Sequence, residues 1–126
     1  MPHEKGKKDY NKPANTFIDQ GVTVQAQRLT GSESVRIDGT FIGDIELDAY
    51  LQIGETGQIE GNLNVTYAII AGEITGNIVC RATLHLSAKA RVYGNIAATH
   101  VIIDEGAVFY GFCETKEIVD AEVVMA

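Results

Sequence analysis

The sequence is poor in cysteine, which can cross-link a chain, and in proline, which interrupts its secondary structure. It has two of each among 126 residues, and no tryptophan. Two cysteines are too few for a disulfide framework, and Cys80 and Cys113 lack the spacing of a metal site. No apolar run approaches the ~20 residues that cross a bilayer, and the N-terminus lacks the apolar stretch of a secretory signal. These absences predict a cytoplasmic protein that needs no metal or other cofactor.

Positive charge is scarce except at the N-terminus. The net charge is −7, yet residues 1–16 carry four lysines against two acidic residues, a net of +2, which leaves −9 for the remainder. An acidic body repels phosphate backbones, so we expect no nucleic-acid binding by the folded part. The first 16 residues also contain both prolines and almost no apolar residues, which predicts a disordered basic tail. Its lysines are Lys5, Lys7, Lys8 and Lys12.

Glycine, in contrast, recurs at nearly constant spacing. The recurring positions are Gly43, Gly61, Gly76, Gly94 and Gly111, with gaps of 18, 15, 18 and 17 residues. A period near 17 is too short for a helical repeat and is typical of one coil of a β-solenoid. The spacing therefore predicts a stack of short strands.

Apolar or small residues occupy every second position around each of these glycines. The segments around Gly61, Gly94 and Gly111 align without gaps, and those around Gly43 and Gly76 align if one corner loses two residues. Period two predicts strands whose alternate side chains point inward, Cys80 and Cys113 among them. We expect an all-β parallel β-helix of about six rungs over residues 17–115, followed by a short strand-like tail at 116–126.

A polar residue follows four of the five glycines. Stacked rungs would align these residues into one outward column, a ladder beside the corner, although the preference of asparagine for turns explains the same pattern. The column consists of Asp44, Asn62, Asn77 and Asn95, and Phe112 takes the fifth position.

The ends of such a stack expose unpaired strand edges, and neither end of this chain shows the helical period of a capping helix. Apolar, uncapped ends predict end-to-end pairing with further copies of the chain. The alternative is that the C-terminal tail folds over its own end and caps a monomer. The expected contact residues are Phe17, Ile18, Val22 and Val24 at one end and Phe109, Tyr110, Phe112 and Val119 at the other.

A hexapeptide-repeat acyltransferase, built on a left-handed β-helix with 18-residue coils, is the main rival interpretation. Periodicity does not separate the two hands, but the 15-residue gap breaks the hexads. Such an enzyme needs a general base, and the candidates are His85 and His100. His85 lies between two inward leucines and His100 lies at a corner, so we expect two surface histidines and assign no catalytic residue.

The Gly-Asn-Ile/Leu corners, the step Asp104-Glu105-Gly106 and the closing segment 106–111 resemble the bactofilins, polymer-forming bacterial cytoskeletal proteins, over residues 17–115. The resemblance implies a right-handed β-helix of triangular cross-section and nucleotide-independent, non-polar filaments joined through like ends. It matches Phe109 to the family's aromatic residue in the final rung. It implies a scaffold rather than an enzyme.

Family members support cell shape or localise cell-envelope proteins, cell-wall enzymes among them. Many attach to the inner face of the cytoplasmic membrane through a short N-terminal motif of apolar and basic residues. The resemblance would place that role, or the binding of a partner, on the basic tail that contains Lys5, Lys7, Lys8 and Lys12. This tail has the charge of the motif but no phenylalanine or leucine.

Overall fold

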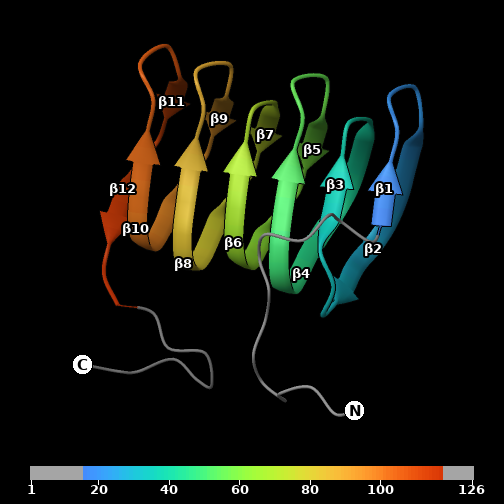
Figure 1. Cartoon of the computed structure of the whole chain (residues 1–126), viewed down its shortest axis with the longest axis horizontal. Helices are drawn as coiled ribbons and strands as arrows, with labels where there is room; N and C mark the ends of the chain where they lie inside the picture. The colour runs from blue at the N-terminus through green and yellow to red at the C-terminus, as the bar shows by residue number, and fades with distance from the viewer. Residues whose placement is uncertain (1–15, 118–126) are drawn as a thin grey trace, which may run out of the picture.

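The computed structural model describes residues 16–117, which form twelve strands and no helix. The chain winds into a solenoid of about six turns, with its first and last coils at opposite ends of the long axis (Figure 1). Within these residues no helix is long and apolar enough to cross a membrane. The predicted all-β solenoid is confirmed, whereas the right-handed turn and the triangular section stay predictions.

Some strands are short because they end before the next corner, and others are longer because they continue around a corner. They are β1 (Thr16–Ile18), β2 (Thr23–Gly31), β3 (Val35–Ile37), β4 (Thr40–Ile53), β5 (Gln58–Glu60), β6 (Leu63–Ile70), β7 (Glu73–Thr75), β8 (Ile78–Leu86), β9 (Arg91–Tyr93), β10 (Ile96–Ile103), β11 (Val108–Tyr110) and β12 (Cys113–Thr115).

Each coil contributes one strand to each of three parallel ladders. The first ladder stacks β1, β3 and the ends of β4, β6, β8 and β10. The second stacks the starts of β2 and β4 on β5, β7, β9 and β11. The third stacks the end of β2, the middle of β4, the starts of β6, β8 and β10, and β12. Every pairing is parallel, as the stacking of successive coils requires.

The strand register confirms the alignment of the repeats. Leu63, for example, pairs with Ile45 in the coil before it and with Ile78 in the coil after it. Two residues separate β3 from β4 and β6 from β7, against four at the equivalent turns after β4, β8 and β10. These are the two corners that the alignment expects to be short. The inward columns form one apolar core that runs along the axis.

Burial is complete in the middle coils and decreases at the two ends. Cys80 is buried, and burial raises the pKa of its thiol to about 11. Cys113 was expected to be buried as well, but it is exposed. It occupies the inward column above Ile96, and none of the described residues forms a further coil to cover it. Among residues 16–117, the interior of the solenoid is therefore left open at its C-terminal end.

The described strands begin at Thr16 and end at Thr115. Thr16 belongs to β1 and pairs with Val35. The division into a tail at 1–16, a solenoid over 17–115 and a tail at 116–126 stays a prediction. Val119 and the four lysines of the N-terminal tail lie outside the described residues.

Candidate functional site

A column of glycines turns the corner between the second and third ladders. Gly61, Gly76, Gly94 and Gly111 have φ angles between +146° and +151°, which side-chain-bearing residues rarely adopt. A Cβ added to any of the four would overlap the carbonyl oxygen of the glycine one coil below. The regular spacing of glycine in the sequence is therefore the mark of a close contact between coils that only glycine permits.

The polar residues next to these glycines form the expected ladder. The backbone N–H of Asn62 donates to Oδ1 of Asp44 at 3.0 Å, and the N–H of Asn77 donates to Oδ1 of Asn62 at 3.0 Å. The N–H of Asn95 continues the series to Asn77 at 2.9 Å, and the N–H of Phe112 ends it on Asn95 at 3.0 Å. Phe112 has no side-chain acceptor to offer to a further coil.

Replacing Asn77 by alanine should lower the free energy of unfolding by ~1 kcal/mol, because the N–H of Asn95 loses its acceptor. Asn77→Asp is the matched control, since a carboxylate oxygen already serves this ladder at Asp44. It should retain most of the stability. Urea unfolding monitored by circular dichroism measures both variants. Equal stability of the wild type and Asn77→Ala would mean that the column reflects only the preference of asparagine for turns.

The C-terminal coil exposes apolar side chains both on its outer surface and at the end of the core. Phe109 is half-buried against the end of the core, in the column that contains Val92. Tyr110 and Phe112 point outward and are 65% and 81% exposed, and Ile103 lies exposed at the open end of the core. In the described part of the chain, β11 pairs only with β9 and β12 only with β10. This end combines an open strand edge with uncovered aromatic surface.

Tyr93 and Tyr110 occupy one outward column of the second ladder, as the alignment predicts. Their rings are stacked, with centroids 5.6 Å apart and planes inclined by 6°. Favourable aromatic contacts fall in this range of separation. The stack therefore helps to fix the last coil on the coil beneath it.

The N-terminal coil brings together two exposed and two covered members of its expected contact set. Phe17 is 58% exposed and Val22 is exposed too, whereas Ile18 is only 9% exposed and Val24 is half-buried. The carbonyl of Ile18 accepts the N–H of Asp38 at 2.7 Å and that of Gly39 at 3.1 Å, which holds β1 on the second coil. Phe17 and Val22 thus supply the apolar surface of this end, and Ile18 supports it from within.

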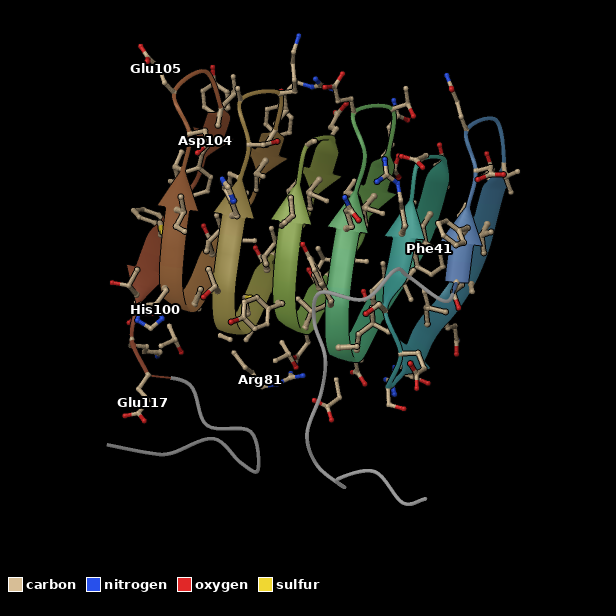
Figure 2. All side chains as sticks on the ribbon, viewed as in Figure 1. Phe41, Arg81, His100, Asp104, Glu105 and Glu117 are labelled. Carbon is tan, nitrogen blue, oxygen red and sulfur yellow. The ribbon has the colours of Figure 1, made fainter. Side chains whose placement is uncertain are left out.

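Both candidate bases of the rival enzyme lie at the surface. His100 is exposed at a corner (Figure 2). Nε2 of His85 lies 3.0 Å from Oδ1 of Asp104, in the turn that follows β10. Sequence reasoning placed His85 at the surface but missed this partner, because a histidine and an aspartate 19 residues apart give no signal unless the register is known.

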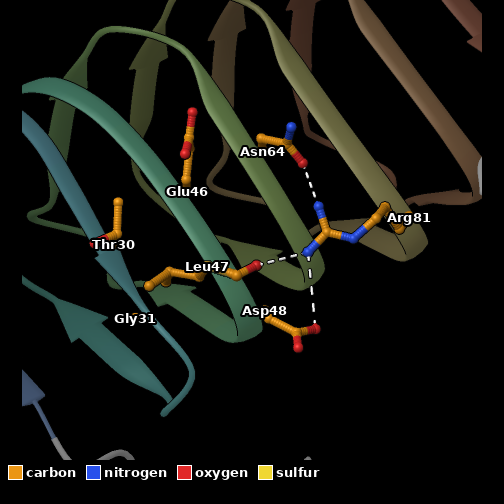
Figure 3. Close-up of a pocket in the computed structure, with 7 residues that line it drawn as sticks. All are labelled: Thr30, Gly31, Glu46, Leu47, Asp48, Asn64 and Arg81. Atoms are coloured by element: carbon orange, nitrogen blue, oxygen red, sulfur yellow. Dashed lines mark hydrogen bonds and ion pairs between the residues drawn. The ribbon is translucent and has the colours of Figure 1, made fainter. Parts of the chain in front are cut away.

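Sequence reasoning also missed a clamp made by Arg81. Its guanidinium donates to the carbonyl of Leu47 at 2.8 Å and to Oδ1 of Asn64 (Figure 3). It also donates to Oγ1 of Thr66 at 2.9 Å. Leu47 lies two coils below Arg81, so a single side chain ties three coils together. Alternation of strand residues predicts only that Arg81 points outward.

Comparison with known proteins gives a match to one family model. Residues 16–114 match the family described as Bactofilin: Polymer-forming cytoskeletal. No curated protein matches the chain, and no solved structure matches it. The matched range begins with β1 and ends within β12, so it covers the solenoid.

Proposed function

Because this chain belongs to the bactofilin family of polymer-forming cytoskeletal proteins, we propose that it assembles end to end into nucleotide-independent, non-polar filaments. These filaments act as a scaffold in the bacterial cytoplasm that supports cell shape or localises cell-envelope proteins. The observation that carries the proposal is that, within the described residues, both ends of the solenoid combine an unpaired strand edge with exposed apolar side chains. In this role the protein is structural and performs no catalysis.

Two physical effects favour joining at these ends. A parallel strand edge offers N–H and C=O groups to another chain, and covering the end of the core removes Phe109 and Ile103 from water. Closed contacts between two identical ends would form a symmetric joint. Two kinds of symmetric joint, one at each end, give a filament without polarity.

The end of the asparagine ladder favours like-to-like joints. In a head-to-tail joint, the first coil of the next copy would sit on the last coil in register. The backbone N–H above Phe112 would then lack the side-chain acceptor that the second to fifth coils each supply. Phe112 supplies none and is instead an exposed apolar surface. A joint between two C-terminal ends does not demand continuation of the ladder.

The N-terminal basic segment supports a second part of the proposal. Lys5, Lys7, Lys8 and Lys12 give this segment the charge to approach an anionic membrane surface or an acidic partner. We assign to it the attachment of the filament to the inner face of the membrane or to cell-wall enzymes. Filament formation itself does not use this segment.

Negative-stain electron microscopy of the purified chain without nucleotide should therefore show filaments, and a variant that lacks residues 1–15 should form them equally well. The deletion stops before β1, so it leaves the first coil complete. Discrete trimers would instead favour the acyltransferase interpretation. Loss of filaments on deletion alone would show that the basic segment is part of the joint.

A further inference from the structure

A joint between two C-terminal ends, as in the proposed filament, is a contact between identical surfaces. It therefore has a two-fold axis that crosses the axis of the solenoid at a right angle. Each coil has three ladders, so an axis that places strand edge on strand edge passes through the middle of one ladder and through the opposite corner. The edge strand of that ladder pairs antiparallel with its own copy, and the other two ladders exchange partners. Three arrangements are possible, one for each ladder.

The corners of the last coil differ in charge. The turn between the first and second ladders contains Asp104 and Glu105, and no ion pair within the described residues includes Glu105. The corner between the third and first ladders follows β12 and contains Lys116. Lys116 is the only lysine or arginine among residues 92–117, and Glu117 follows it. Glu105 and Glu117 lie on opposite sides of the coil (Figure 2), so the acidic turn and the lysine do not contact each other within one chain.

The exposed side chains of the last coil also differ in polarity. Ile102 points outward from the first ladder and is 48% exposed, and Phe112, at the corner between the second and third ladders, is 81% exposed. The outward residue of the third ladder is Glu114, whose side chain is 65% exposed. Tyr110 holds an outward position at the end of the second ladder. The first ladder thus ends in an apolar outward side chain and the third ladder in a charged one.

Two of the three arrangements bring unfavourable neighbours together. If the third ladder pairs with itself, Glu114 lies opposite Glu114 of the other copy and the two acidic turns meet, and like charges directly opposite each other destabilise a sheet. If the second ladder pairs with itself, the first ladder meets the third. Ile102 then faces Glu114, and Phe112 faces the acidic turn. Apolar contacts of this kind remove water from carboxylates without giving them a partner.

The remaining arrangement, in which the first ladder pairs with itself, places apolar against apolar and opposite charges together. Ile102 lies opposite Ile102 of the other copy, at the short separation of directly opposed side chains. The axis leaves through the corner between the second and third ladders, so the two Phe112 side chains meet there. The second ladder meets the third, which places the inward Phe109 beside the inward column of Cys113 and closes the core. Each acidic turn meets a corner that contains Lys116.

Lys116 can reach this turn because its present partner holds it weakly. Its Nζ lies 3.6 Å from Oε1 of Glu114, and the two side chains are 58% and 65% exposed. Ion pairs this open to water contribute little. An ammonium group has three N–H donors, so Lys116 can donate to Glu105 of the other copy while it stays near Glu114. Glu105 is the better acceptor in the turn, because Asp104 already contacts His85.

We propose that two C-terminal ends join with the last strand of the first ladder antiparallel to itself, so that Ile102 meets Ile102 and Lys116 of each copy pairs with Glu105 of the other. Phe112 lies against Phe112 at the opposite corner. This pairing specifies the contact surface of the proposed end-to-end assembly and rests on that proposal. The two-fold axis repeats each contact, so one joint contains two Lys116–Glu105 ion pairs.

Disulfide cross-linking of the full-length chain tests which ladder pairs with itself. Cys113→Ala first removes the exposed native thiol, and a single cysteine then replaces either Ile102 or Glu114. Both positions point outward from the last coil, so each variant is the matched control of the other. Copper phenanthroline oxidises the thiols under assembly conditions, and a non-reducing gel measures the dimer. Ile102→Cys should form dimer about tenfold faster than Glu114→Cys, because directly opposed positions on antiparallel strands fall near disulfide geometry.

Charge reversal tests the ion pair. Lys116→Glu and Glu105→Lys should each raise the concentration at which assemblies form about fivefold, because each joint loses two surface ion pairs and gains like-charge contacts. The double variant Lys116→Glu/Glu105→Lys restores these pairs and should assemble like the wild type. The matched control is Lys116→Glu/Glu114→Lys, which restores only the pair within one chain and should assemble as poorly as Lys116→Glu. Light scattering over a dilution series measures assembly, and circular dichroism checks that the variants are folded.

The outcomes separate this joint from filament formation itself. Cross-linking of Glu114→Cys that equals or exceeds that of Ile102→Cys would overturn the pairing of the first ladder with itself. Rescue by Lys116→Glu/Glu114→Lys instead of Lys116→Glu/Glu105→Lys would overturn the ion pair between copies. In both cases the chain still assembles, so the proposed function stands. A wild-type chain that stays monomeric at every concentration would overturn the proposed function and the joint with it.

Discussion

Replacement of Gly76 by alanine is expected to abolish the folded solenoid, with a loss of more than ~4 kcal/mol in the free energy of unfolding. Gly76 has a φ of +146°, and an added Cβ would overlap the carbonyl oxygen of Gly61 in the coil below. The obstacle is backbone, so no side chain can rotate away. Relief would require the two coils to separate, which would break the ladders on both sides of the corner and open the core.

Gly31→Ala provides the matched control for this prediction. A Cβ at Gly31 would lie 3.6 Å from Cδ2 of Leu47, an ordinary van der Waals contact. That variant should unfold within ~0.5 kcal/mol of the wild type, because alanine restricts the unfolded chain without straining the folded one. Thermal and urea unfolding followed by circular dichroism compare the two variants. A Gly76→Ala protein that unfolds like the wild type would contradict the stacking of the glycine column.

The coil length and the inward columns could be predicted because they rest on constraints that recur in every coil. Gly61, Gly76 and Gly94 meet the same backbone contact one coil below, so a single chemical requirement repeats along the sequence. The alternation that buries Leu63 and Ile78 repeats for the same reason. A structural requirement that recurs in every coil produces the same residue type at a regular spacing, so a single sequence is enough to reveal it.

The side-chain contacts that join different positions of the repeat in separate coils could not be predicted. Arg81 reaches Leu47 two coils away, and His85 contacts Asp104, which lies in a turn of the next coil. Each contact occurs once and joins residues at different places in the repeat. A long side chain at an outward position has several neighbours within reach, and sequence spacing does not choose among them.

The exposure of the candidate contact residues depends on the coils that cover them as well as on strand alternation. Cys80 and Cys113 both lie at inward positions of the third ladder, yet Cys80 is buried and Cys113, in the last described coil, is exposed. Alternation alone separates two neighbours in the first coil: Ile18 stacks on Ile37 and is 9% exposed, whereas Phe17 pairs with Arg36 and is open to solvent. Alternation fixes the direction of a side chain, and the coils on either side decide how far an inward side chain is buried.

Phe109→Arg is expected to convert filaments into single folded particles. Phe109 continues the inward column of Phe41, Ile74 and Val92, but it packs against the core from below only. In an isolated chain, an arginine there can extend its guanidinium into water. A second copy stacked on this end would bury that charge without a partner, at a cost of several kcal/mol. Assembly should therefore fail while the coils below stay folded.

Phe41→Arg and Phe109→Leu are the controls for this variant. Phe41 occupies the same column at 1% exposure (Figure 2), so arginine there should unfold the protein. Phe109→Leu keeps the end apolar and should still assemble. Size-exclusion chromatography with light scattering at several concentrations, together with circular dichroism, separates loss of assembly from loss of fold. Large assemblies of folded Phe109→Arg would show that the joint does not cover this end. Unfolding of Phe109→Arg to the extent of Phe41→Arg would instead place the last coil inside the cooperative core, leaving the N-terminal end as the surface at which copies join.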